Sequence, residues 1–149
     1  MDLVWWSALF LLGFLVMEPV TAALHRLVMH GIGWGWHRDH HQARGRRLER
    51  NDRYPIVFAC AVGVILITGG LVDQLWFLMP LGYGVTAYGA AYAVVHDLAI
   101  HRRLGPVRPR GAWLDRLAEA HAEHHRTNGA PYGMLWPVRA RNAEHVRSR

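Results

Sequence analysis

The feature that most constrains this 149-residue chain is a histidine pattern that occurs twice. In each copy two histidines are separated by four residues, and further along a single histidine is followed after two residues by a histidine pair. The first copy comprises His25, His30, His37, His40 and His41, and the second comprises His96, His101, His121, His124 and His125. Ten of the eleven histidines are thereby used, so we expect both copies to serve one site.

The spacing suggests how these imidazoles bind metal, since imidazole is the commonest protein ligand for iron, zinc and copper. Residues i, i+3 and i+4 share one face of an α-helix, so the two triplets that begin at His37 and His121 can each converge. Residues i and i+5 lie about 140° apart. His25 and His30 therefore either serve different metals or straddle a helix end, and Gly31 favours the helix end. The same choice holds for the pair that begins at His96.

The ligand set argues against the common zinc sites. Structural zinc prefers four tetrahedral ligands, which are often thiolates, and Cys60 is the only cysteine. Neither the His-Glu-x-x-His pattern of zinc proteases nor the Glu-x-x-His pair of carboxylate di-iron bundles occurs. Ten imidazoles fit two six-coordinate ions with about five each, which leaves one position on each metal for water, a bridge or dioxygen.

Composition and hydropathy indicate an all-α integral membrane protein. With 52% hydrophobic residues and seven tryptophans, the chain suits a membrane better than a small soluble core. We predict a single domain over residues 1–149, with membrane spans at about 3–24, 55–71 and 75–95. The last two spans form a hairpin that returns the second histidine set to the first, so that a helical cap at residues 25–41 and 96–125 holds both metals. A signal peptide at residues 3–24 is disfavoured, because no basic segment precedes it and no small-residue cleavage site follows it.

Charge distribution predicts the topology. All seventeen basic residues are arginines, and none precedes His25 or lies between Tyr54 and His101. Short arginine-rich loops stay in the cytoplasm, so the amino terminus is expected outside, and the histidines and the polar tail at 137–149 inside. In a bacterium this is the cytoplasmic side of the inner membrane. The net charge of +6 is then a topology signal, and nucleic-acid binding is disfavoured.

Several positions within this frame carry a more local prediction. Glu18 and Pro19 interrupt the first span, and we favour a kink with Glu18 hydrogen-bonded to a neighbouring helix over a role behind a metal ligand. The Gly-rich run 31–36 is expected to form a turn, and Asn51 or Asp52 to cap the second span. Cys60 is expected to be inert packing.

The glycines and alanines of the last two spans either allow close helix contact or leave room for a long flat substrate.

After a basic, Pro-broken loop, a helix is expected to start near Ala112 and to present leucines and then histidines on one stripe. Ligating histidines usually donate their second N–H to a carboxylate or carbonyl group. The carboxylate candidates are Asp39, Asp97, Glu119 and Glu123, although each lies close to a histidine in sequence and surface charge is favoured for any single one. His145, in the polar tail, falls outside the pattern and is expected to be exposed.

The four histidine motifs and their flanking words carry a resemblance to a known family. The stretches MEPVTAALHRLVMHGIGWGWH, ERNDRYPIVFA and TAYGAAYAVVHD resemble the membrane di-iron fatty acid hydroxylase superfamily, and within it the bacterial β-carotene 3-hydroxylases. The likeness covers roughly residues 17–126. It implies a non-haem di-iron monooxygenase that uses dioxygen, takes electrons from a separate ferredoxin and hydroxylates the β-ionone rings of β-carotene through cryptoxanthin to zeaxanthin.

Three alternatives share the histidines: another membrane lipid hydroxylase, a desaturase or a carotenoid ketolase. A non-enzymatic metal-binding membrane protein is a further alternative, less favoured than these. The tail at residues 127–136 departs from the family's usual cysteine- and phenylalanine-containing stretch, which puts substrate fit rather than the metal site in doubt.

Overall fold

The structure is a computed structural model that describes residues 2–42, 48–103, 105 and 111–136, and within these ranges every regular element is a helix. The α-helices are α1 at Leu3–Leu24, α2 at Trp34–His41, α3 at Arg53–Leu71, α4 at Leu78–Ala93 and α5 at Ala112–Thr127. Two π-helical segments, η1 at His25–Ile32 and η4 at Val94–Ile100, continue α1 and α4. Short 3₁₀ turns occupy Arg50–Asp52 (η2) and Asp73–Leu75 (η3). The described part of the chain is thus all-helical, as its sequence predicts.

Among the residues that the structure describes, three helical stretches are long and apolar enough to cross a membrane: Leu3–Ile32, Arg50–Leu71 and Leu78–Ile100. The predicted number of spans is therefore confirmed. The third helix begins at Leu78 rather than at residue 75, because the hairpin turn contains the 3₁₀ segment Asp73–Leu75. The second begins at Arg53, with Pro55 in its first turn where no backbone donor is needed.

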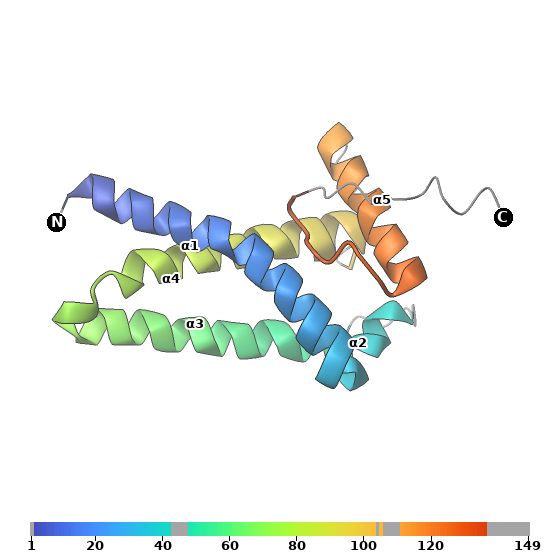
Figure 1. The fold of residues 1–149 in the computed structure, drawn as a ribbon, viewed down its shortest axis with the longest axis horizontal. Coiled ribbons are helices and arrows are strands. Elements are labelled where there is room, and N and C mark those ends of the chain that lie inside the picture. The colour runs from blue at the N-terminus through green and yellow to red at the C-terminus, as the bar shows by residue number, and fades with distance from the viewer. Residues whose placement is uncertain (1, 43–47, 104, 106–110, 137–149) are drawn as a thin grey trace.

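The spans place the histidine-bearing segments 25–41 and 96–125, as far as they are described, at one end of the molecule. In Figure 1 the amino terminus and the α3–α4 turn lie at one end, while α2 and α5 lie at the other. Apolar side chains of the spans, such as Leu11, Leu15, Val64 and Ile67, are exposed. The buried polar residues are histidines instead: His25, His37, His40, His96, His121 and His124. The lipid bilayer favours apolar side chains on the outside and polar groups inside, because its hydrocarbon offers no hydrogen-bond partners.

The helices approach each other through glycines. Helix α1 packs most extensively on α4, and a Cβ at Gly84 would collide with the backbone of α1 at Phe10, while one at Gly13 would collide with the backbone of α4 at Leu81. Helices α3 and α4 approach each other closely at Gly82, where a Cβ would collide with the Leu66 side chain. Small residues allow such backbone contact in lipid, where burial of apolar surface gives helices no reason to associate.

The histidine-bearing end has its own small core. Val95 of η4, Leu117 of α5 and Met134 are buried against one another, with Tyr92 and Leu114 at the margin. This contact holds α5 across the end of η4 and explains why the apolar stripe of α5 precedes its histidines.

Two local predictions are wrong. The Gly31–Trp36 run is not a turn throughout: Gly31 has a non-helical backbone, but α2 begins at Trp34 and both tryptophans are helical. Asn51 and Asp52 do not cap α3, since Asp52 at the N-cap position makes no side-chain hydrogen bond to it. Asp52 instead accepts a hydrogen bond from the Glu49 backbone N–H and caps the preceding 3₁₀ turn.

Cys60 does not pack inside the helices as expected, because it is exposed on α3. The polar tail at 137–149, including His145, lies outside the described residues, as does most of the Pro-broken loop before α5.

The glycine crossing generates a stability prediction. Gly84→Ala places a methyl group against the α1 backbone, and overpacking of this kind costs about 1–3 kcal/mol. Gly89→Ala on the same helix is the matched control, because a Cβ there meets nothing within 4 Å and alanine favours a helix. Thermal unfolding in detergent should show a lower midpoint for Gly84→Ala only; equal midpoints would argue against the crossing.

Candidate metal centre

The two histidine pairs with i,i+5 spacing are brought together by π-helical backbone. His25 and His30 lie in η1, and His96 and His101 at η4, where the His101 backbone N–H donates to the His96 carbonyl at 2.9 Å. The i→i+5 bonding of a π-helix sets such residues one above the other. The ring centroids are 5.0 Å apart in the first pair and 4.5 Å in the second. The 140° separation expected for an α-helix is therefore wrong here, and each pair lies within one cluster.

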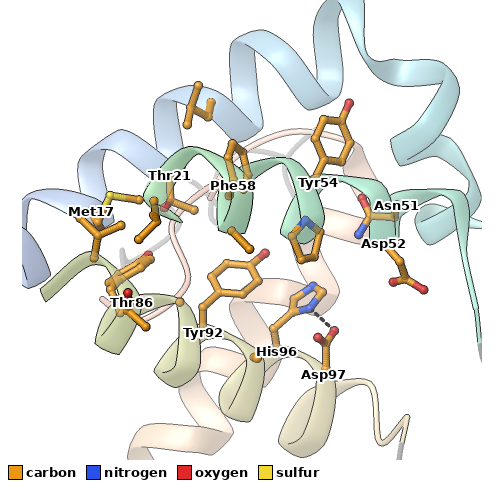
Figure 2. A pocket seen from close by; sticks show the side chains of 18 of the residues that line it. Met17, Thr21, Asn51, Asp52, Tyr54, Phe58, Thr86, Tyr92, His96 and Asp97 are labelled. Atoms are coloured by element: carbon orange, nitrogen blue, oxygen red, sulfur yellow. Dashed lines mark hydrogen bonds and ion pairs between the residues drawn. The ribbon is translucent and has the colours of Figure 1, made fainter. Parts of the chain in front are cut away.

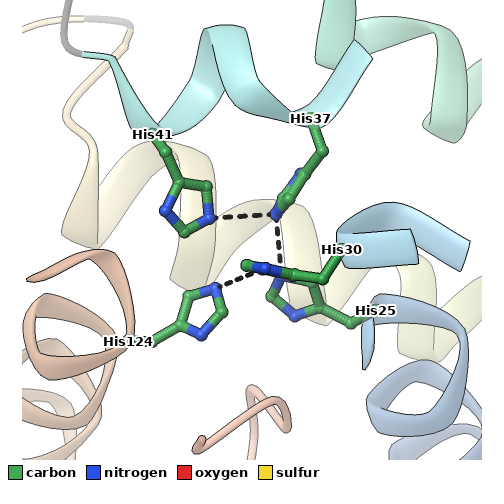
Figure 3. Close-up of side chains that lie close together, drawn as sticks. All are labelled: His25, His30, His37, His41 and His124. Carbon is green, nitrogen blue, oxygen red and sulfur yellow. Dashed lines mark hydrogen bonds between the residues drawn. The ribbon is translucent and has the colours of Figure 1, made fainter. Parts of the chain in front are cut away.

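The first cluster, which Figure 3 shows, gathers side chains from α2, α5 and η1. Its members are His25, His30, His37, His41 and His124, and one nitrogen of each lies within 4.8 Å of all the others. The Nε2 atoms of His25 and His37 are 2.9 Å apart, those of His37 and His41 3.1 Å, and those of His30 and His124 3.1 Å.

The second cluster is built in the same way from α2, η4 and α5. His40, His96, His101 and His121 offer nitrogens within 4.8 Å of one another. The Nε2 atoms of His96 and His40 are 3.1 Å apart, and that of His121 lies 2.8 Å from both His101 and His125. His125 therefore borders this cluster. All ten histidines singled out from the sequence are accounted for by the two clusters.

Each predicted triplet is divided between the clusters rather than converging on one ion. In α2, His37 and His41 face the first cluster and His40 the second; in α5, His124 faces the first and His121 the second. The three residues do share one face, as predicted, but the clusters lie side by side along that face. The ring of His41 stacks on that of His125 at 4.2 Å, where the two clusters meet.

In five of the rings, a hydrogen bond made by Nδ1 determines that Nε2 is the nitrogen that faces a cluster. Nδ1 of His25 donates to the Tyr132 carbonyl at 3.0 Å, and Nδ1 of His124 to the Gly129 carbonyl at 2.5 Å. Three side chains accept from the others: Asn51 from His37 at 2.7 Å, Glu49 from His40 at 2.9 Å and Asp97 from His96 at 2.8 Å. A neutral imidazole with its proton on Nδ1 carries its lone pair on Nε2. The lone pairs of these five rings therefore face the clusters.

Only one of the predicted carboxylate partners has this role. Asp97, in the π-helical segment η4, accepts a hydrogen bond from Nδ1 of the neighbouring His96 at 2.8 Å. Glu119 is exposed and Glu123 pairs with Arg126, as expected of surface charges, while Asp39 accepts from the Arg50 backbone N–H. Sequence reasoning missed Glu49 and Asn51, whose only signal is their position shortly before a predicted span.

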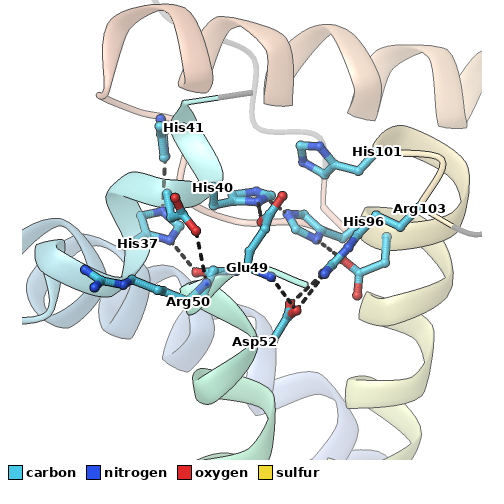
Figure 4. A network of polar contacts seen from close by, with 12 residues as sticks. His37, His40, His41, Glu49, Arg50, Asp52, His96, His101 and Arg103 are labelled. Carbon is cyan, nitrogen blue, oxygen red and sulfur yellow. Dashed lines mark hydrogen bonds and ion pairs between the residues drawn. The ribbon is translucent and has the colours of Figure 1, made fainter. Parts of the chain in front are cut away.

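Arg103 supports this end of the site and is shown in Figure 4. Its guanidinium binds the Asp52 carboxylate through two hydrogen bonds of 2.6 and 2.7 Å, and lies 3.6 Å from Asp97. Asp52 beside it holds the pKa of Arg103 above its usual range. The bidentate pair ties the end of η4 to the start of α3.

Burial keeps four of these histidines neutral. Together with the neighbouring histidines it lowers the pKa of His37 and His101 to about 3, of His41 to about 4 and of His125 to about 2. At pH 7 these rings therefore present lone pairs rather than positive charge, which is the form that binds a metal ion.

The distances between facing nitrogens in the clusters fit a bound divalent cation. His25 and His37 each donate through Nδ1, so at neutral pH two lone pairs face each other across 2.9 Å. Such a contact is repulsive unless a cation is bound by both. Two nitrogens at about 2.1 Å from one ion and at right angles to each other are about 3 Å apart. The observed separations of 2.8 to 3.1 Å match this spacing in both clusters.

Glu18 connects the first span to the metal site. Its carboxyl group accepts hydrogen bonds from the Tyr88 hydroxyl on α4 at 2.7 Å and from the backbone N–H groups of Met134, Leu135 and Trp136 at 2.8, 3.0 and 3.2 Å. The predicted bond to a neighbouring helix is thus confirmed. The larger finding is that Glu18 holds the segment 131–136, which we call the strap.

The strap belongs to the metal site, contrary to the expectation that its sequence affects substrate fit alone. The Tyr132 ring lies 5.4 Å from the rings of His30 and His124 and 5.6 Å from the ring of His25. The Tyr132 carbonyl also accepts a hydrogen bond from Nδ1 of His25. No sequence pattern reveals this contact, because the acceptor is a backbone carbonyl.

A cavity of about 450 Å³ runs between α1, α3 and α4 to the two clusters. Figure 2 shows its lining, with Met17 and Thr86 at one side and Asn51, Asp52 and His96 at the other. It touches one ring of each cluster, His37 and His96. Gly63 and Gly89 line it and have open space where a Cβ would lie, so at these two positions small residues leave room rather than allow helix contact.

The Glu18 hydrogen bonds generate a prediction about the strap. Glu18→Gln replaces one acceptor oxygen by an amide donor, so at least one backbone N–H loses its partner. A hydrogen bond to a charged group contributes about 1.5–3 kcal/mol, which corresponds to roughly 10–100-fold faster exchange. Hydrogen exchange by mass spectrometry should show this acceleration in the peptide with Met134–Trp136. Glu119→Gln, at an exposed position, is the control, and similar exchange in both variants would contradict the role of Glu18.

The sequence is similar to that of known proteins. Residues 10–140 match the fatty acid hydroxylase family. The chain is 43% identical over 138 residues to a β-carotene hydroxylase from Pantoea ananas, covering 88% of this chain and 77% of that protein. It is 41% identical over 119 residues to a β-carotene hydroxylase from a Paracoccus species, covering 77% and 71%. A chloroplastic β-carotene 3-hydroxylase from Arabidopsis thaliana is 39% identical over 127 residues, and the match covers 80% of this chain but only 40% of the plant protein.

The comparison with solved structures gave no match. The match over residues 10–140 and the identity to bacterial hydroxylases over most of both chains lead to one conclusion. The chain belongs to the fatty acid hydroxylase family.

Proposed function

We propose that this chain is a single membrane hydroxylase domain that uses two iron ions and dioxygen to hydroxylate the β-ionone rings of a carotenoid. The observation that carries the proposal is that ten imidazole nitrogens converge in two adjacent clusters at the end of an apolar cavity. The similarity to β-carotene hydroxylases supports the choice of substrate. The reaction takes β-carotene through β-cryptoxanthin to zeaxanthin.

The proposed ligands of the first iron are His25, His30, His37, His41 and His124, and those of the second are His40, His96, His101, His121 and His125. About five imidazoles each leave one position open on six-coordinate ions, which favours iron over tetrahedral zinc. When bound and reduced, the iron pair supplies the activation of dioxygen that attack on an unactivated C–H bond requires.

The protein's own part is to place one ring carbon at the clusters and to exclude water. The cavity is lined mostly by apolar side chains, and polar ones such as Asn51 and Asp97 line its inner end. Thr86 and Gly89 line it and are also exposed, so the cavity opens on the outer surface of the spans. A lipid-soluble polyene therefore enters from the bilayer, and its terminal ring reaches His37 and His96.

Each turnover consumes dioxygen, two electrons and two protons, and yields one hydroxyl group on the ring and one water. We propose that a separate ferredoxin supplies the electrons. Its acidic surface complements the exposed arginines at the histidine-bearing end, which include Arg38 and Arg102. A symmetric substrate is hydroxylated once, released, turned end for end and hydroxylated again.

Expression in bacterial cells that accumulate β-carotene tests the reaction. The monohydroxylated pigment should appear first and then decline as the dihydroxylated pigment rises. Gly89→Phe should abolish both products while metal content persists, because its side chain fills the open space in the cavity. Ala90→Phe, at an exposed position that does not line the cavity, is the matched control.

Other outcomes assign other functions. A keto group, a new double bond, or a hydroxylated lipid of another kind would replace the carotenoid assignment by a ketolase, a desaturase or a general lipid hydroxylase. Metal binding without oxygen consumption in the presence of any of these substrates would indicate a metal carrier.

We further propose that the chain lies in the bacterial inner membrane with its metal site on the cytoplasmic side. Arginines are absent from the chain before His25 and between Tyr54 and His101, and cluster near the histidines, which is the bias of cytoplasmic segments. Alkaline phosphatase, which is active only outside the cytoplasm, should be inactive when fused after Arg149 and active when fused after Gln74 in the α3–α4 turn. The reverse result would invert the topology.

A further inference from the structure

The two clusters differ in the charge of the groups behind their ligands. In the first cluster the acceptors of the Nδ1 hydrogen bonds are neutral: the carbonyls of Tyr132 and Gly129 and the amide oxygen of Asn51. In the second they are the carboxylates of Glu49 and Asp97. The nitrogen–nitrogen distances within the clusters are alike, so the charge behind the ligands differs between two positions of similar geometry.

Both carboxylates are held where their charge acts on the histidine. The Glu49 carboxylate is 2.9 Å from Nδ1 of His40 and also receives the Asp52 backbone N–H, which fixes its direction. Arg103 is the nearest counter-charge to Asp97, at 3.6 Å, but both of its terminal nitrogens bind Asp52 at 2.6 and 2.7 Å. Arg103 is thus shared between two carboxylates and lies closer to Asp52, while Asp97 keeps its 2.8 Å contact with Nδ1 of His96.

A carboxylate that accepts the second N–H of an imidazole draws that proton toward itself and makes the opposite nitrogen a stronger donor to a metal. A neutral carbonyl or amide does this less strongly. Two negative charges close to one ion also favour its higher oxidation state through simple Coulomb attraction, which is stronger in a buried site than in water. Both effects act in the same direction on the second cluster.

We propose that the second cluster is the tighter of the two metal positions and fills first, with Glu49 and Asp97 as its positioning residues. The inference rests on the proposed binding of two metal ions by this site. It assigns distinct roles to the clusters, because the ion held at the second gives up an electron more readily and the ion at the first is the easier to reduce.

The test is metal binding by the full-length apo-protein in detergent, measured with Co²⁺ alone by equilibrium dialysis against a chelator. Two Co²⁺ ions should bind in two resolved steps. His101→Ala should remove the tighter step and His41→Ala the weaker one, which assigns the steps to the second and first clusters. Glu49→Gln and Asp97→Asn should each weaken the tighter step by about 10–100-fold and leave the weaker step unchanged.

Asn51→Asp provides the reciprocal variant. It places a carboxylate behind His37 of the first cluster, so the weaker step should strengthen and approach the tighter one. Circular dichroism and the unfolding midpoint of each apo-variant establish that it is folded. A further readout is the order of reduction in ⁵⁷Fe-loaded protein, in which the Mössbauer signal of one iron should become ferrous before that of the other.

The outcomes separate this inference from the proposed function. Binding of fewer than two Co²⁺ ions per chain would overturn both. Two ions that bind with equal affinity, or a loss of both steps together in Glu49→Gln and Asp97→Asn, would overturn the assignment of roles and leave the two-metal site standing. An unchanged weaker step in Asn51→Asp would likewise contradict it.

Discussion

The structure depends on imidazole lone pairs that point at one another. His25 and His37, and likewise His40 and His96, donate through Nδ1, so their Nε2 lone pairs face each other at 2.9 and 3.1 Å and repel. The rest of the fold must hold them there or an ion must be bound by them. Hydrogen bonds behind His25, His37, His40, His96 and His124 supply part of the restraint. Glycine contacts between α1 and α4 and the pairing of Arg103 with Asp52 supply the rest, because they fix the helices from which the rings project.

Much of the fold follows from the sequence by physical rules that act locally. Apolar length predicts the spans, the absence of arginine marks their extent, and the return of the second histidine set requires a hairpin. The start of α5 near Ala112 also agrees with its stripe of leucines and histidines. The nine clustered histidines and the adjacent His125 are all singled out by the sequence, because only spacing and residue type are needed to recognise them.

The remainder depends on details that the sequence pattern does not carry. The spacing of His25 and His30 allows either different metals or a helix end, and the π-helical backbone that puts both in one cluster has no signature in the pattern. The division of each triplet between two clusters depends on where the other helices lie. The carbonyls of Tyr132 and Gly129 have no side-chain signature, and Asp97 was judged a surface charge on the assumption of an α-helix. Tertiary contacts decide each of these.

The sharing of α2 and α5 between both clusters has a consequence for how the protein is made. A chain emerges from the ribosome amino terminus first, so the spans and α2 are in place before α5 exists. His124 of α5 completes the first cluster and His121 the second, and the strap that follows closes behind His25. Neither cluster is complete until α5 and the strap have been synthesised. A nascent chain that lacks these segments therefore holds only part of each histidine cluster.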